Sequence, residues 1–267
     1  MSTYTQGHSP AVVASHAART VENSAAFVLP HLRPHFTVVD LGCGPGTITR
    51  GFCAHVPDGS VVGIDAAAAV IDLARAGSSP DEYPNLSFRV GDITARLPWD
   101  DGSVDVVYTS QVLYHIPHPV RVIREARRIL KPGGLLAMRE TDSLIYHPAN
   151  PGTEAYRATM AKAVAPGAQG IGSGRRVHRW AQEAGFDRAT MQVRAGATCH
   201  PAPDESRWWA GVQVGRLRGE IGHKWLHELQ LVQSQDEIDA MVAGLTAWGD
   251  SPEAWYVALQ GEVICWK

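Results

Sequence analysis

A short strand, a glycine-rich turn and a helix follow one another early in the chain, and this order limits the folds available to it. Thr37–Leu41 is an apolar run typical of a buried parallel strand. Asp40-Leu-Gly-Cys-Gly-Pro-Gly46 ends that strand, and a helical stretch begins at Thr47. Glycines let the backbone approach a ligand where a Cβ atom would collide. The order predicts a nucleotide-type site at the carboxyl edge of a parallel sheet.

The alternation of strand and helix continues as far as residue 138. The expected strands are Ser60–Asp65, Leu86–Val90, Val104–Tyr108 and Leu135–Met138, and the expected helices between them are Ala66–Ala76 and Val120–Leu130. Such alternation is typical of right-handed βαβ units, whose parallel sheet is covered by helices on both faces. The sequence therefore predicts an α/β fold with a Rossmann-like sheet.

The flanking segments follow a less regular pattern. Ser9-Pro10 is a good helix start, and the helix is expected to end near Pro30. Beyond residue 142 the expected elements are helices over 152–165, 176–184 and from the Ser234–Glu237 capping box to Trp248, and extended segments over 188–193 and 256–266.

Composition limits the partners and the compartment. Hydrophobic residues make up 45% of the chain and charged residues 19%, as in ordinary globular proteins. The formal net charge is -3, whereas nucleic-acid-binding proteins usually carry an extended basic surface. The basic run at Arg121, Arg124, Arg127 and Arg128 has the spacing of a solvated helix face. We expect no nucleic-acid partner.

Neither a secretory signal nor an apolar run of membrane-spanning length is visible. The cysteines Cys43, Cys53, Cys199 and Cys265 have no metal-binding or redox spacing. These features favour a cytoplasmic protein with free thiols.

Several ordered motifs together resemble the class I S-adenosylmethionine-dependent methyltransferases, in particular the branch that contains the ubiquinone and menaquinone biosynthesis enzymes. The motifs are Val39–Gly46, Val62–Asp65, Gly91–Ile93, Asp105–Ser110 and Leu130–Leu135. The resemblance implies a seven-stranded, mostly parallel sheet with an inserted helical cap. It divides the chain into an N-terminal helical lid (1–36), a cofactor-binding core (37–200, with a helical insertion at about 150–175), a Trp-rich cap (201–250) and a final strand (251–267).

The resemblance also implies cofactor contacts. Asp65 is expected to bind both ribose hydroxyls, although an acid at this point could also simply begin a helix. Asp92 would bind the adenine amino group and Ile93 the ring, unless Gly-Asp here only forms a turn. Arg19 could pair with the cofactor carboxylate, or be a surface residue. The other expected cofactor residues are Asp40, which would order the loop, Gly42, Gly44, Pro45, Gly46, Ala66, Gly91, Ser110 and Gln111.

Methyl transfer from a sulfonium is an in-line displacement, which requires positioning and sometimes a base but no metal. The candidate bases are His115 and Tyr114, which follow the fourth strand, and Tyr4 and His8, which belong to the expected lid. Each could instead have a packing role. His223 and His227 have metal-compatible spacing, but no further ligands are evident and we expect no metal.

The acceptor is expected to be a small, aromatic or natural-product-like molecule methylated on carbon, oxygen or nitrogen. Tryptophans crowd the last quarter of the chain and, with Tyr156 and the 170–174 loop, could wall an apolar pocket, although most are expected to pack the cap and about two to touch the substrate. These tryptophans are Trp208, Trp209, Trp225, Trp248, Trp255 and Trp266. The cap also offers apolar surface for a homodimer. The alternatives are a methyltransferase-fold protein that binds the cofactor without methyl transfer, such as a cyclase or sensor, and a dinucleotide oxidoreductase. Gly42-x-Gly44-x-Gly46 differs from the GxGxxG spacing of such oxidoreductases.

Overall fold

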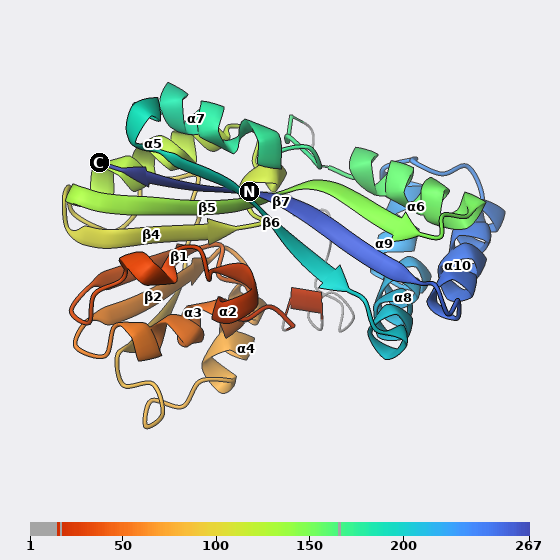
Figure 1. The fold of residues 1–267 in the computed structure, drawn as a ribbon, viewed down its shortest axis with the longest axis horizontal. Coiled ribbons are helices and arrows are strands. Elements are labelled where there is room, and N and C mark those ends of the chain that lie inside the picture. Colours follow the sequence, from red (N-terminus) through yellow and green to blue (C-terminus); the bar gives the residue numbers. More distant parts are fainter. Residues whose placement is uncertain (1–14, 17, 165–166) are drawn as a thin grey trace.

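One sheet organises the part of the chain that the structure describes, residues 15–16, 18–164 and 167–267 of a computed structural model. Its seven strands lie in the order β3-β2-β1-β4-β5-β7-β6 (Figure 1). Pairs among β1 to β5 are parallel, whereas β7 runs antiparallel to both β5 and β6. This seven-stranded, mostly parallel arrangement confirms the expected fold class.

The first strands are the ones whose limits the sequence defines best. β1 (Thr37–Leu41), β2 (Ser60–Asp65) and β3 (Leu86–Val90) have the expected limits, and β4 (Val104–Ser110) continues two residues further. Parallel strands covered on both faces are apolar along their whole length, and turn residues mark their ends. Because that pattern lies within each short segment, the strand limits can be predicted from the sequence.

Alternate residues of the central strands enter two separate cores. Val38 and Val106 lie in one core, with residues of α2 (Val21–Ser24) and α3 (Thr47–Gly51) packed against it, while α4 (Ala68–Ala76) packs Ile71 and Ala74 against Phe88 of β3. Val39 and Val107 lie in the other, beneath α5 (Pro119–Ile129) and α7 (Val177–Glu183). The period of two along a strand places neighbouring side chains on opposite faces. Both faces of the sheet are therefore covered, as expected of βαβ units.

Three strands extend beyond this core and carry a second group of helices. β5 (Leu130–His147) and β7 (Trp255–Trp266) run from the core to this group (Figure 1), and β6 (Gln192–His200) pairs with β7 at the sheet edge. A register shift between Thr141 and Ser143 interrupts the β5–β7 pairing at the start of the extension. The helices are α6 (Pro151–Lys162), α8 (Pro203–Arg218), α9 (Glu220–His223), the π-helix η6 (Lys224–Glu228) and α10 (Gln235–Gly249).

The tryptophans of this helical group divide into core and surface residues. Trp225 and Trp248 are each 1% exposed and lie in the core between the helices and the extended strands. Trp208 and Trp255, by contrast, are 40% and 42% exposed. Trp225 and Trp248 therefore pack the helical group, which is the role that the sequence analysis expected of most of the tryptophans.

Several expected boundaries were wrong. A single helix was expected as far as Pro30, but Thr20 caps a separate short helix, α2, through reciprocal bonds with Asn23. α4 begins at Ala68 and not at Ala66, since Ala67 is extended and its N–H donates to the Asp65 carboxylate in a turn that precedes the helix. Ser234 precedes α10 as expected, but its side chain makes no capping hydrogen bond.

The extended segments also differ. The strand expected at 188–193 is a 3₁₀ turn, η5 (Arg188–Thr190), followed by β6, and β5 is much longer than the expected 135–138. The remaining 3₁₀ turns are η1 (Leu29–His31), η2 (Phe52–His55), η3 (Leu113–His115) and η4 (Gly174–Arg176). No helix in the described ranges is long and apolar enough to cross a membrane.

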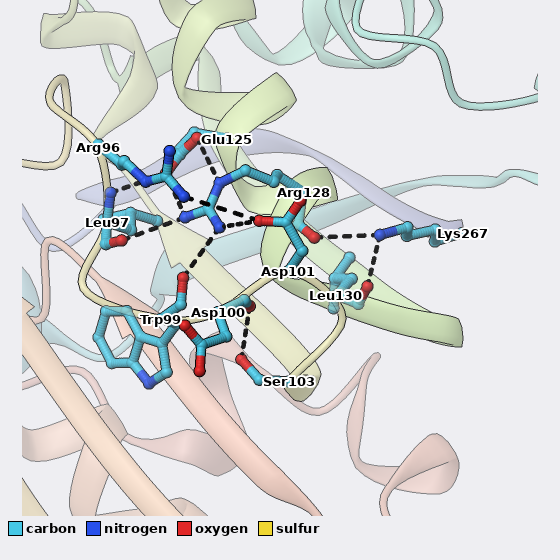
Figure 2. A network of polar contacts seen from close by, with 10 residues as sticks. All are labelled: Arg96, Leu97, Trp99, Asp100, Asp101, Ser103, Glu125, Arg128, Leu130 and Lys267. Carbon is cyan, nitrogen blue, oxygen red and sulfur yellow. Dashed lines mark hydrogen bonds and ion pairs between the residues drawn. The ribbon is translucent and has the colours of Figure 1, made fainter.

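Arg128 of α5 lies at the centre of a polar network that joins helix, loop and strand (Figure 2). Its guanidinium donates to the carboxylates of Glu125 and Asp101 and to the backbone carbonyls of Leu97 and Trp99. The Arg128 side chain is only 18% exposed. Arg128 therefore departs from the solvated helix face expected of the basic run, whereas Arg121 and Arg124 are exposed as expected.

The chain terminus joins the same region. Lys267 Nζ donates to the carbonyls of Arg128 and Leu130 at 3.1 and 2.7 Å (Figure 2). Its backbone N–H donates to Gly134 O at 2.9 Å, and its own carbonyl accepts from Gly133 N at 2.8 Å. These bonds fasten the end of β7 to the turn within β5.

Replacing Arg128 with Ala should lower the free energy of unfolding by about 2–3 kcal/mol, because a part-buried cation and several of its acceptors lose their partners. Urea denaturation measures the change. Arg121→Ala on the exposed face of the same helix is the matched control and should cost less than about 0.5 kcal/mol. Equal losses in the two variants would show that the network contributes no stability.

Candidate functional site

A cavity of about 270 Å³ opens at the carboxyl ends of β1, β2 and β4. β1 lies between β2 and β4, so strand order reverses here. In open α/β sheets such a switch point is where ligands bind, because the loops leave in opposite directions. We call this the first cavity, and it is lined chiefly by the segments 40–48, 65–70, 92–93 and 108–116.

The glycine loop after β1 forms one wall of the first cavity. Gly42, Gly44 and Gly46 all have positive φ angles of 75°, 55° and 78°. A Cβ atom at Gly44 would meet nothing within 4 Å, whereas at Gly42 and Gly46 it would collide with Val112 and Phe88 at 2.5 and 2.6 Å. Gly42, Gly44 and Pro45 line the cavity, but Gly46 does not. The lack of a side chain at Gly44 therefore keeps space open for a ligand. At Gly42 and Gly46 it allows Val112 and Phe88 to pack against the loop.

Asp65, at the end of β2, connects the glycine loop to the next helix. Its Oδ2 accepts from Gly44 N at 3.1 Å and its Oδ1 from Ala67 N at 3.0 Å. Both Asp65 and Ala66 line the first cavity. The carboxylate thus holds the loop in shape and also presents acceptor oxygens to the cavity.

Asp92 and Ile93 line the same cavity from the loop after β3. Asp92 Oδ1 accepts from the backbone N–H and the hydroxyl of Thr94, so it forms the turn that the alternative interpretation described. A carboxylate has two accepting oxygens, and this turn uses only one of them. Gly91 is not a lining residue, and a Cβ atom there would meet Ile64 at 2.6 Å.

Asp40 lies beneath the loop and is 3% exposed. Its Oδ2 accepts the hydroxyl of Thr49 at 2.7 Å, which ties β1 to α3. Burial raises the pKa of the Asp40 carboxyl to about 7, against the hydrogen bond from Thr49, which lowers it. The expected role of Asp40 in ordering the glycine loop stays a prediction.

The end of β4 carries Ser110 and Gln111, both of which line the first cavity. Gln111 has a φ of 55°, a left-handed conformation that is uncommon outside glycine. Its N–H donates to Arg139 O at 2.7 Å, and its side-chain oxygen accepts from Arg19 at 2.9 Å. Arg19 thereby lies at the cavity rather than on a remote surface.

A buried acid that the sequence gave no reason to select supports this turn. Glu140 is 0% exposed, and its carboxylate accepts from the backbone N–H groups of Val112, Leu113 and Tyr114 at 3.0, 2.8 and 3.3 Å. Burial raises the pKa of Glu140 to about 7, although these three bonds lower it. Its place within the long β5 explains why local patterns did not identify it.

The candidate bases differ in their surroundings. His115 lies in the first cavity, is 8% exposed and packs its ring against that of Tyr114 at 3.8 Å. Burial lowers the pKa of His115 to about 3, and the positive charges of Arg19 and Arg216 contribute to the shift. Its imidazole is therefore neutral at pH 7 and a weak proton acceptor. Tyr4 and His8 lie outside the described residues.

A second cavity of about 550 Å³ adjoins the first. Its walls come from the extended strands β5, β6 and β7 and from α6 and α8. His16, Arg19, Gln111 and Tyr114 line both cavities and form their shared boundary. Three of the aromatic residues that the sequence suggested for a pocket, Tyr156, Trp208 and Trp209, line this cavity. Its other principal lining residues, which the sequence did not single out, are Tyr146, His200, Gln213, Arg216 and Tyr256.

The chemistry of the first cavity suits S-adenosylmethionine. Acidic acceptors at Asp65 and Asp92 match a ribose diol and an adenine amino group, and Ile93 and Val70 offer apolar contact. The open space at Gly44 admits the close approach that the ligand requires. Among the described residues no group of three or more His, Cys, Asp or Glu could hold a metal ion, and His223 and His227 gain no third ligand there.

Comparisons with known proteins agree with the geometry. The profile described as "Methyltransferase domain" matches residues 32–185. The chain is 30% identical to the probable methyltransferase ltbC of Aspergillus luteorubrus, over 99% of this chain and 97% of that protein. A trans-aconitate 2-methyltransferase of Deinococcus radiodurans is 38% identical over 40% of this chain and 38% of that protein.

The fold has counterparts among solved structures. The YcgJ protein of Bacillus subtilis has a TM-score of 0.59 and 16% identity, with 92% of this chain and 98% of that one covered. At this identity the likeness shows the fold alone. Fold and sequence together define the class of nucleotide-type α/β enzymes with a ligand site at the switch point. Within that class, the chain belongs to the S-adenosylmethionine-dependent methyltransferases.

The raised pKa of Asp40 predicts how the stability of the ligand-free protein depends on pH. Between pH 4 and pH 7 the folded state keeps a proton on Asp40 that the unfolded state, with a pKa near 3.8, has lost. Stability contributed by this group therefore falls as pH rises, by on the order of 4 kcal/mol over that range.

Asp40→Asn should remove this decline, so that the variant gains stability relative to wild type as pH increases from 4 to 7. Chemical denaturation at several pH values measures the difference. Asp72→Asn, at a carboxylate that is 73% exposed, is the control and should follow wild type. A constant difference between Asp40→Asn and wild type would contradict the raised pKa.

Proposed function

We propose that this protein transfers a methyl group from S-adenosylmethionine in the first cavity to a small aromatic acceptor in the second. The observation that carries the proposal is the shared boundary, where His16, Arg19, Gln111 and Tyr114 line both cavities. An in-line displacement needs the donor carbon and the accepting atom to face each other across such a boundary. A site for the cofactor alone would not require the second cavity.

Different residues of the first cavity would bind different parts of the cofactor. Asp65 would accept from the ribose hydroxyls, and Asp92 and Ile93 would hold the adenine. Ser110, Gln111 and Arg19 would meet the methionine part, with the Arg19 guanidinium suited to the carboxylate. When bound, the cofactor supplies an activated methyl carbon and leaves as S-adenosylhomocysteine.

The protein's own contribution is then positioning, water exclusion and removal of a proton where the acceptor carries one. His115 is poorly suited to accept that proton, because burial lowers its pKa to about 3. His16 and Tyr114 border the second cavity as well, so proton acceptance is assigned to one of them. His115 instead packs against Tyr114 and would fix the position of that ring.

The acceptor is inferred from the second cavity rather than from relatives. The similarity to the trans-aconitate 2-methyltransferase covers only 40% of this chain, so the acceptor of that enzyme is not assigned to this protein. The aromatic residues of the second cavity favour a flat, aromatic acceptor.

The proposal includes a cytoplasmic location and a homodimer. The cysteines at 43, 53, 199 and 265 form no disulfide, which suits a reducing compartment. Exposed apolar side chains at Ile145, Trp255 and Leu259 lie on the extended strands and offer surface for a second copy.

Isothermal titration with S-adenosylmethionine and S-adenosylhomocysteine tests the cofactor assignment. Wild type should bind both, and Asp65→Ala should weaken both by about tenfold to a hundredfold, because the diol loses charge-assisted acceptors. Asp72→Ala on α4 is an exposed control and should bind like wild type. If wild type binds neither compound, the proposed function is wrong.

A further inference from the structure

We propose that Glu140 is a positioning residue for methyl transfer, which holds Tyr114 at the shared boundary and, through Tyr114, part of the wall of the second cavity. Its carboxylate lines neither cavity, yet it would set the position of donor and acceptor relative to each other. This inference rests on the proposed function, because it concerns the boundary between the same two cavities. The unequal bonding of the two carboxylate oxygens and the backbone contacts of Tyr114 support it.

The two oxygens of Glu140 hold different parts of the turn after β4. Oε1 accepts from Val112 N at 3.0 Å and from Leu113 N at 2.8 Å, whereas Oε2 accepts from Tyr114 N at 3.3 Å. Glu140 is 0% exposed, so solvent reaches neither oxygen. A change at Oε2 would therefore remove the bond to Tyr114 while the bonds to Val112 and Leu113 remain.

The backbone of Tyr114 connects this bond to the second cavity. Its carbonyl accepts from Gln169 N at 3.1 Å and from Gly170 N at 2.9 Å. The next residue, Ile171, lines the second cavity, as Tyr114 itself does. The N–H of Tyr114 is thus held by the acid, and its carbonyl holds the segment 169–171. A shift of Tyr114 would move this part of the cavity wall together with the boundary.

The other end of the same segment lies against the backbone of Glu140. A Cβ atom at Gly174 would lie 2.7 Å from Glu140 O and 2.7 Å from Gly261 N, so the chain passes close to both strands there. Between the two ends, the buried hydroxyl of Ser173 donates to Gly170 O at 2.5 Å. The segment from 169 to 174 is therefore confined between Tyr114 and β5.

The proton on Glu140 determines how well Oε2 can accept. Burial raises the pKa of Glu140 to about 7, so the acid gains and loses a proton in the neutral range. A proton on Oε1 would disturb two bonds, whereas a proton on Oε2 disturbs one longer bond, so we place it on Oε2. The bond from Tyr114 then loses its charge assistance and weakens. Tyr114 should therefore be held more firmly above pH 7 than below it.

The charged groups around Glu140 do not themselves titrate in this range. The Arg19 guanidinium lowers the pKa of Glu140 and keeps its charge throughout. Burial lowers the pKa of His115 to about 3, so that ring stays neutral. Neighbouring charges on β5 and on η4 are paired: Arg139 with Glu262, on the opposite face of the strand, and Arg175 with Asp142.

Hydrogen exchange of backbone amides in the ligand-free protein tests the role of Glu140 directly. Nuclear magnetic resonance follows each amide between pH 6 and pH 8, with correction for the intrinsic exchange rate. Protection of the Tyr114, Gln169 and Gly170 amides should rise by about tenfold over this range, which is the size of a charge-assisted hydrogen bond. Amides of β2 should show no such rise.

Glu140→Gln removes the bond to Tyr114 selectively. The amide oxygen can still accept from Val112 and Leu113, but its NH₂ group is a donor and opposes the Tyr114 N–H. Protection of the same three amides should be about tenfold lower than in wild type at pH 8 and should no longer depend on pH. Glu140→Asp restores a carboxylate and should restore the dependence on pH.

Asp40→Asn is the matched control for these variants. It removes the other buried acid whose pKa is raised to about 7, but Asp40 bonds α3 and not the turn after β4. The rise in protection between pH 6 and pH 8 should therefore persist in Asp40→Asn. If Glu140→Gln does not fold, the pH profiles of wild type, Glu140→Asp and Asp40→Asn still decide the question.

Isothermal titration with S-adenosylhomocysteine connects the turn to the first cavity, which residues 110–116 line except for Leu113. Wild type should bind more tightly at pH 8 than at pH 6, and Glu140→Gln should bind about tenfold more weakly than wild type at pH 8. The ratio of the two affinities should shrink at pH 6. Ionisation of the ligand affects both proteins alike and cancels in this ratio.

The outcomes separate the two proposals. If wild type does not bind S-adenosylhomocysteine, the proposed function is wrong, while the exchange data still decide whether Glu140 holds Tyr114. Normal binding together with equal protection at pH 6 and pH 8 would overturn only the positioning role. A rise in protection that persists in Glu140→Gln, or that disappears in Asp40→Asn, would overturn it as well.

Discussion

The buried carboxylate of Glu140 fixes the backbone on which both cavities depend. It accepts from three consecutive N–H groups, those of Val112, Leu113 and Tyr114, and so holds the turn that leaves β4. That turn begins with Gln111 in a left-handed conformation and places Tyr114 at the shared boundary. Burying a carboxylate is unfavourable unless it is hydrogen-bonded, and here the loop itself supplies the donors.

The sequence determined the cofactor half of the fold closely because its signals are local. β1, β2 and β3 are apolar runs bounded by glycine, proline and polar turns, and their ends coincide with the expected ones. β5 was underestimated because the run from Arg139 to Asp142 is polar. In the structure Arg139 is buried and paired with Glu262, Thr198 and Gln260, residues distant in the chain. No pattern within a single segment reveals such partners.

The same distinction separates the two halves of the site. Gly42, Gly44, Asp65 and Asp92 stand at strand ends, where topology alone brings side chains to one edge. The second cavity depends on the meeting of α8 with the far ends of three strands, which is set by tertiary packing. Tryptophan content predicted an aromatic wall in general terms. It did not distinguish Trp209 at the cavity from Trp225 and Trp248 in the core.

The register shift between Thr141 and Ser143 has a consequence for how such a protein can diversify. It divides β5 into an inner part that supports the first cavity through Glu140 and an outer part that contributes Leu144 and Tyr146 to the wall of the second cavity. Because both parts belong to one continuous strand, the spacing of the two cavities is built into the backbone. Under the proposed function, substitutions in the outer part would change which acceptor binds, while the spacing between donor and acceptor would stay the same.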